Sequence, residues 1–170
     1  MKTVFVGLAL LSGLLMASCH PEAESGVAIH LLDEPTTSAE VLGADISTLV
    51  PEEYPLIGEE HIVSYDQATH EMFLTDEGFQ RVRDLFGAPV RTSGTPFCVT
   101  VDGEPIYAGA FWTPLSSQSY DGVVILDPMT LSPGRIRIDL GYPGPDFFAG
   151  PDPRGDPRIM KSLRKAGKLQ

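Results

Sequence analysis

Basic residues are scarce in this chain. Its 170 residues include 12 lysines and arginines against 23 aspartates and glutamates, a formal net charge of −11. Proteins that bind nucleic acid neutralise phosphates with a basic surface, so this balance argues against nucleic acid as a partner. The basic residues are also unevenly placed. Six of them lie from Arg154 onward, where Asp156 is the only acidic residue, while residues 19–153 hold five basic and 22 acidic residues, a net of −17.

Long apolar runs are missing after the start of the chain. The first run, Val4–Met16, has about 13 residues, short of the roughly 20 that a membrane-spanning helix needs. Lys2 precedes this run and the small residues Ala17 and Ser18 follow it. A positive start, a short apolar stretch and small residues at the end predict a secretory signal peptide over residues 1–18. Plain secretion and a retained membrane anchor are the alternatives.

A cysteine stands directly after the predicted signal peptide. The segment Leu15–Cys19 resembles the lipobox of bacterial lipoproteins, in which the chain is cut before the cysteine and the thiol is acylated. The resemblance implies a bacterial cell-envelope protein that acyl chains on Cys19 hold to a membrane. His20 stands where many Gram-negative lipoproteins of the inner membrane have aspartate. In such an organism the resemblance therefore implies the outer membrane, facing the periplasm. Residues 19–25 then form a polar tether.

The chain has only one other cysteine, Cys98. If Cys19 is acylated, Cys98 has no disulfide partner. Its neighbours Phe97 and Val99 predict that the thiol is buried in a strand as a small apolar group. No cationic side chain nearby would activate it as a nucleophile.

The rest of the sequence predicts a single domain over residues 26–157, followed by a basic helix or tail over 158–170. Thr75 is suited to cap a helix over 76–86, and Asp102-Gly103 is suited to a tight type I′ turn. Strands outnumber helices and the helices do not alternate with them regularly. The expected fold class is therefore α+β, a mainly antiparallel sheet with one to three helices packed on it. Apolar alternation predicts strands at 27–32, 62–66, 71–74, 97–101, 106–112, 123–126 and 136–140.

Residues 71–126 resemble the head of the first periplasmic domain of the SecD/SecDF protein-export subunits. The shared features are Leu74-Thr75-Asp76-Glu77-Gly78 before an amphipathic helix, an apolar strand ending in Asp102-Gly103, and the apolar strand from Gly122 to Leu126. The resemblance implies a mobile, non-enzymatic envelope domain that contacts other polypeptides. The membrane-spanning helices of the export subunits are missing, so proton-driven export is not implied. A close packing contact is the expected reason for Gly78.

Serines cluster in the loop Ser116–Ser119, beside aromatic residues. A serine hydrolase would need one of them next to a base and an orienting acid, for which His61 or His70 with Asp66 or Asp102 are the candidates. No Gly-x-Ser-x-Gly elbow is present to hold such a group together. We therefore expect hydrogen-bonded loop serines and no catalytic residue.

Metal and cofactor motifs are equally weak. His61, Asp66 and His70 have side chains that suit divalent ions, but their spacing matches no known ligand pattern. No glycine-rich phosphate loop is present. We therefore expect neither a metal nor a cofactor.

The second half of the chain holds the candidate binding surface, built from aromatic residues beside Gly/Pro loops and from the basic end of the chain. Its predicted members are Trp112, Tyr120, Phe147, Phe148, Arg158, Lys161, Arg164 and Lys165. An exposed patch of this kind suits a protein or lipid partner. The basic residues would either dock on the acidic body of the protein itself or meet anionic headgroups or an acidic partner.

Together these observations predict a non-catalytic, lipid-anchored envelope protein that binds another envelope protein. One alternative is a carrier of a small apolar or lipid ligand, with an enclosed pocket lined by Trp112, Phe147 and Phe148. The less favoured alternative is the serine hydrolase.

Overall fold

A computed structural model describes residues 25–33, 36–87, 91–128 and 133–170. The predicted signal peptide, Cys19 and the tether up to residue 24 lie outside the described residues. The strands in the described ranges are β1 (Val27–Leu31), β2 (Ile62–Asp66), β3 (Glu71–Leu74), β4 (Thr95–Val101), β5 (Glu104–Trp112), β6 (Tyr120–Leu126) and β7 (Arg135–Tyr142). The helices are α1 (Ser38–Val41), α2 (Asp76–Gly87) and α3 (Pro157–Lys165), with 3₁₀ turns η1 (Ile46–Thr48), η2 (Glu59–His61) and η4 (Pro145–Phe147).

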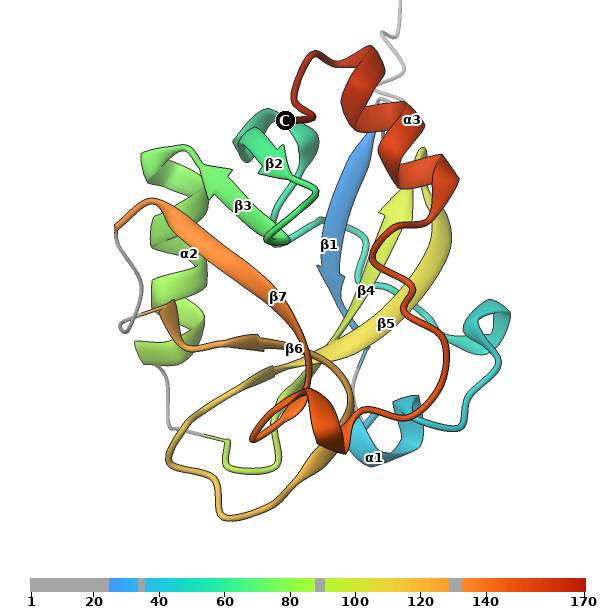
Figure 1. Cartoon of the computed structure of the whole chain (residues 1–170), viewed down its shortest axis with the longest axis vertical. Coiled ribbons are helices and arrows are strands. Elements are labelled where there is room, and N and C mark those ends of the chain that lie inside the picture. Colours follow the sequence, from blue (N-terminus) through green and yellow to red (C-terminus); the bar gives the residue numbers. More distant parts are fainter. Residues whose placement is uncertain (1–24, 34–35, 88–90, 129–132) are drawn as a thin grey trace, which may run out of the picture.

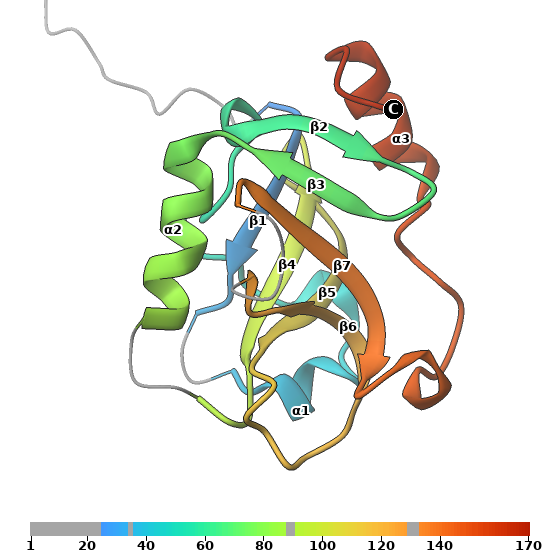
Figure 2. The same cartoon turned by 60° about the vertical axis from the view of Figure 1, so that its left-hand side comes forward.

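The strands form one curled sheet in the order β1-β4-β5-β6-β7-β3-β2 (Figures 1 and 2). Neighbouring strands are antiparallel except β5 and β6, which are parallel. The loop 113–119 carries the chain back alongside β5, so that β6 starts in the same direction. The predicted α+β fold with a mainly antiparallel sheet is confirmed, and the parallel pair makes that sheet a mixed one.

The main core lies inside the curl of the sheet and receives side chains from every one of these strands. α2 covers one flank with Val82, and α3 closes another with Ile159, Met160 and Leu163 (Figures 1 and 2). The basic end of the chain is therefore packed into the same core as the strands. On the other side of the sheet Cys98 is fully buried beside Leu32 and Val41, as the sequence predicted.

Two local predictions are confirmed at α2 and at the β4–β5 hairpin. The Gly78 N–H donates to Thr75 Oγ1 at 3.2 Å, so Thr75 caps α2. Asp102 and Gly103 have φ angles of 51° and 80°, the left-handed pair that a type I′ turn requires. A β-carbon on Gly78 would lie 2.7 Å from the His61 β-carbon, so close packing does explain this glycine.

Short segments cover both outer strands of the sheet. Ile57 pairs with Ile29 along the free side of β1. On the opposite side, the Tyr65 N–H donates to the Lys168 carbonyl at 2.7 Å, and the Gln170 N–H donates to the Tyr65 carbonyl at 2.8 Å. The C-terminal residues thus extend the sheet beyond β2. Covered edges of this kind leave fewer unpaired backbone groups available to other chains.

Candidate functional site

Tyr54 is the most exposed aromatic residue in the described part of the chain, with 72% of its surface accessible. It lies on a loop that is fixed at both ends against β1. At one end the Glu52 N–H donates to the Leu31 carbonyl at 2.9 Å, and at the other the Ile57 N–H donates to the Ile29 carbonyl at 3.1 Å. His30 Nδ1 also contacts the Glu52 carbonyl at 2.8 Å. The loop is therefore held in place while its tyrosine faces solvent.

A groove of about 390 Å³ lies between this loop and α2, and we call it the Tyr54 groove. Leu31, Leu56 and Leu85 form its apolar part, and each of these leucines packs partly on the main core. Arg81 and Asp84, one turn apart on the exposed side of α2, supply charges of both signs at the rim. An apolar centre with an aromatic residue and a charged rim is the composition of a protein-binding site.

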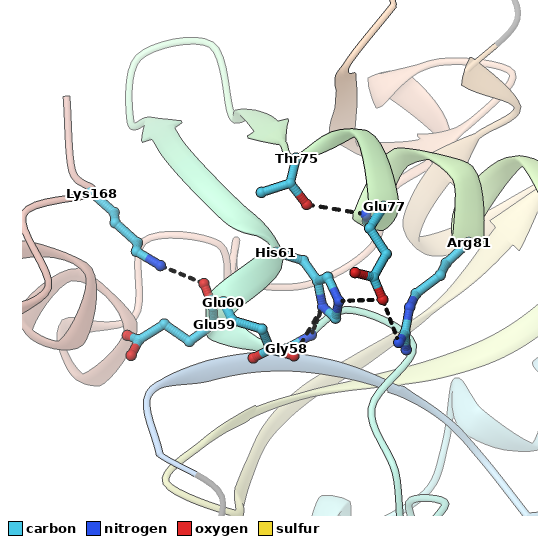
Figure 3. Close-up of polar contacts among 9 residues, drawn as sticks. Gly58, Glu59, Glu60, His61, Thr75, Glu77, Arg81 and Lys168 are labelled. Carbon is cyan, nitrogen blue, oxygen red and sulfur yellow. Dashed lines mark hydrogen bonds and ion pairs between the residues drawn. The ribbon is translucent and has the colours of Figure 1, made fainter.

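Polar contacts hold the rim of the Tyr54 groove in position (Figure 3). Arg81 donates to Glu77 Oε1 at 2.9 Å, and this hydrogen bond lowers the pKa of the Glu77 carboxyl. The same carboxylate oxygen lies 3.6 Å from Nε2 of the buried His61. His61 Nδ1 accepts the Gly58 N–H at 3.0 Å and also lies 3.2 Å from Glu60 Oε1. Arg81 is thus connected through Glu77 and His61 to the turn η2.

A second groove, of about 640 Å³, lies between α3, the tip of the β4–β5 hairpin and the start of β1. We call it the α3 groove. Lys161 and Lys165 line it from α3, and Asp102 and Glu104 line it from the hairpin. Ser25, the first described residue of the chain, lies in the same groove. The described part of the chain therefore begins at this groove.

Glu59 of η2 also lines the α3 groove. Its carbonyl accepts a hydrogen bond from Lys168 Nζ, next to the end of α3 (Figure 3). The two grooves therefore share one supporting turn, since η2 carries both Glu59 and His61.

The prediction that Trp112 and Tyr120 belong to an exposed aromatic surface is wrong. Trp112 and Tyr120 are only 2% and 4% exposed, because their rings stack on each other with centroids 5.0 Å apart in a buried cluster. Phe148 packs partly against the main core, whereas Phe147 is 48% exposed. Trp112 and Phe148 pack in different clusters of the described residues, which removes support from a carrier pocket built from both.

The enclosed apolar cavity within the main core is also too small for a ligand. It has a volume of about 10 Å³, and its lining includes Tyr65, Met72 and Leu163. This is about the room that one water molecule needs. A carrier of an apolar molecule would need a far larger enclosed space.

The basic residues of the predicted surface are accessible to solvent. Arg158, Lys161, Arg164 and Lys165 are all exposed on α3. Arg158 is occupied by a bidentate contact with Asp156, at 3.0 and 2.8 Å. Within the described ranges, the side chains of the other three make no hydrogen bond or ion pair. The segment nevertheless docks on the body of the protein, since α3 packs into the main core and its groove brings Glu59, Asp102 and Glu104 near Lys161 and Lys165.

The serine loop is held by structural hydrogen bonds. Ser116 is buried, and its hydroxyl donates to the Thr92 carbonyl at 2.6 Å and accepts the Gln118 N–H at 3.2 Å. A nucleophilic serine would instead give its proton to a base. The loop 113–119 lies at the opposite end of the molecule from β2 and β3 in both views (Figures 1 and 2). The proposed pairing of Ser116–Ser119 with His61 or His70 is therefore not formed.

His61 and His70, the two histidines considered as catalytic bases, lie in separate environments. His70 Nδ1 and the Tyr65 hydroxyl share a hydrogen bond of 2.7 Å. Burial raises the pKa of Tyr65 and lowers the pKa of His70, so a neutral tyrosine donates to a neutral imidazole. Asp66 instead accepts the N–H groups of Ala68 and Thr69 in its own turn. Among the described residues no three metal-binding side chains come together.

Sequence reasoning missed Tyr54. The available signal was its position between Pro51 and Pro55 in a polar stretch, which is typical of a loop that leaves the core.

The described part of the chain has no helix with the length and apolar character needed to cross a bilayer. Comparison of the whole chain with protein-family models, with curated proteins and with solved structures finds no match.

Proposed function

We propose that this protein is a non-catalytic component of the bacterial cell envelope, anchored through acyl chains on Cys19, that binds another envelope polypeptide through the Tyr54 groove. The observation that carries the proposal is the exposed Tyr54 ring on a fixed loop beside three leucines. The signal-like start of the sequence and the lipobox at Leu15–Cys19 support the location.

Tyr54 and its ordered loop can bind a partner with little loss of conformational entropy. Tyrosine offers a large contact area with few rotatable bonds, and tyrosine and arginine are frequent among the residues that dominate binding energy. The hydrogen bonds of Glu52 and Ile57 already order the loop, so binding does not have to order it. Arg81 and Asp84 at the rim then favour a partner segment with complementary charges.

Site-specific photo-crosslinking in the bacterium tests this proposal. A photoreactive phenylalanine analogue replaces Tyr54 in the full chain, and the control carries it at Leu115, which is 75% exposed on the distant loop 113–119. We expect an adduct with a defined envelope protein from position 54 and no such adduct from position 115. The same adducts from both positions would contradict the proposal.

The affinity of the identified partner gives the second measurement. Tyr54→Ala in the full chain should weaken binding by more than about 1 kcal/mol, or at least about fivefold in Kd. Leu115→Ala is the matched control, because it removes an exposed apolar side chain far from the groove. An unchanged Kd for Tyr54→Ala would remove the groove from the proposal.

A further inference from the structure

The outward side of α3 is basic. Its inward side contributes Ile159, Met160 and Leu163 to the main core. At 3.6 residues per turn, Lys161 and Lys165 lie on the side opposite Leu163, and Arg164 lies next to them. We call Lys161, Arg164 and Lys165 the α3 basic face. Glu59, Asp102 and Glu104 line the same groove, but no carboxylate among the described residues forms an ion pair with these three side chains, so they can still contact a partner.

The position of this face relative to the chain's start suggests which partner it meets. Ser25 and Gly26 line the α3 groove together with Lys161 and Lys165. Cys19 precedes Ser25 by six residues, which span at most about 20 Å even when fully extended. Acyl chains on Cys19 would therefore keep α3 close to the membrane surface.

Charge then decides which side of the protein turns toward the lipid. Residues 19–153 carry a net charge of −17, whereas the segment from Arg154 onward carries six basic residues and one acidic residue. A membrane that contains anionic lipid repels the first part and attracts the second. The attraction acts within about 8 Å at physiological ionic strength, so it needs the short distance that the tether imposes.

We propose that the α3 basic face lies against anionic phospholipid headgroups of the membrane that holds Cys19. This contact gives the anchored domain one orientation on the bilayer. The proposal rests on the acylation of Cys19 in the proposed function, and it is independent of the Tyr54 groove.

Lysine labelling tests the contact directly, because all lysines after the predicted signal peptide lie at 161, 165 and 168. The lipidated full chain is reconstituted into vesicles of phosphatidylcholine, with or without phosphatidylglycerol, and labelled with an amine reagent whose sites are read by mass spectrometry. We expect Lys161 and Lys165 to react about fivefold more slowly on the anionic vesicles, the effect of one basic residue at an anionic surface. Lys168, whose Nζ donates to the Glu59 carbonyl, serves as the internal reference.

Two matched variants separate local charge from total charge. Arg164→Gln removes one charge from the basic face and should reduce the protection of Lys161 and Lys165. Arg83→Gln removes the same charge from the exposed side of α2 and should leave the protection unchanged. High salt should abolish the protection in every case.

Other results would overturn the assignment. Equal labelling on both types of vesicle would show that α3 does not meet anionic lipid. Protection by polyglutamate but not by phosphatidylglycerol would assign the basic face to an acidic polypeptide instead. The acyl anchor is tested separately by flotation with pure phosphatidylcholine vesicles. A chain that does not float with these vesicles, yet is protected on anionic vesicles, would contradict the acyl anchor and still support the contact of the α3 basic face with anionic lipid.

Discussion

Gly78 and His61 meet where α2 begins. The glycine lies in the first turn of the helix, and its missing side chain makes room for the buried imidazole. That imidazole in turn connects Gly58 of the η2 segment to Glu77 of α2. The contact lets α2 approach η2, and so it also positions Arg81 at the rim of the Tyr54 groove.

Gly78→Ala tests this packing. Alanine favours a helix by about 1 kcal/mol over glycine, so an unhindered site would become more stable. Here the added carbon would lie 2.7 Å from the His61 β-carbon, which cannot move without its backbone. Overpacking costs about 1–3 kcal/mol, and we expect a net loss of about 1 kcal/mol in the free energy of unfolding, measured with urea.

The control for this variant is Gly87→Ala at the end of the same helix. A β-carbon on Gly87 would have no atom within 4 Å, so this variant should be neutral or slightly stabilising. Equal effects at both glycines would show that His61 yields and that the contact is loose.

At the scale of elements, the C-terminal segment acts as a short extra strand. Residues 168–170 follow α3 after a turn at residues 166 and 167, and they exchange main-chain hydrogen bonds with Tyr65 of β2. Leu169 also packs against the main core. The three residues thus connect the end of α3 to the outer strand of the sheet.

Deletion of residues 168–170 should lower the free energy of unfolding by about 1–3 kcal/mol, because it leaves main-chain groups of β2 without partners. The newly exposed edge should also increase self-association, which light scattering would detect. Gln170→Ala keeps the main-chain bonds and is expected to behave as the wild type. A deletion variant that matches the wild type in both measurements would mean that the segment contributes nothing to the sheet.

Local signals in the sequence predicted the elements well and their partners poorly. The helix after Thr75 and the turn at Asp102-Gly103 follow from short motifs whose geometry is set by neighbouring residues. The parallel pairing of β5 with β6 depends on contacts between distant residues, which alternation of side chains does not specify. The same limit explains the error at Trp112 and Tyr120, since each lies beside a loop and is buried by stacking on the other and by packing against Val124 and Tyr142.

For the whole molecule, charge is the dominant property. After removal of the predicted signal peptide, 11 basic residues face 23 acidic ones, a net of −12. Like charges distributed over one small domain repel one another and destabilise the compact state. The ion pairs that offset this are mostly at the surface, such as Arg81 with Glu77, where each contributes little.

Added salt should therefore stabilise the protein. Screening of the repulsion is expected to raise Tm, by about 2–4 °C for each kcal/mol gained in a domain of this size. Differential scanning calorimetry across a sodium chloride series measures the effect. Arg83→Glu, which makes the surface more acidic, should show a steeper rise. A Tm that falls with salt would mean that the ion pairs outweigh the net repulsion.

Because α3 forms part of the core, the core can be completed only late in the synthesis of the chain. Residues 157–170 are synthesised after all seven named strands, yet they supply Leu163 to the core and the segment that pairs with β2. The domain therefore has no complete interior until this segment has been synthesised. For the proposed envelope protein, this late completion of the core would favour passage through a membrane channel in the unfolded state, because a domain that folds too early would block the channel.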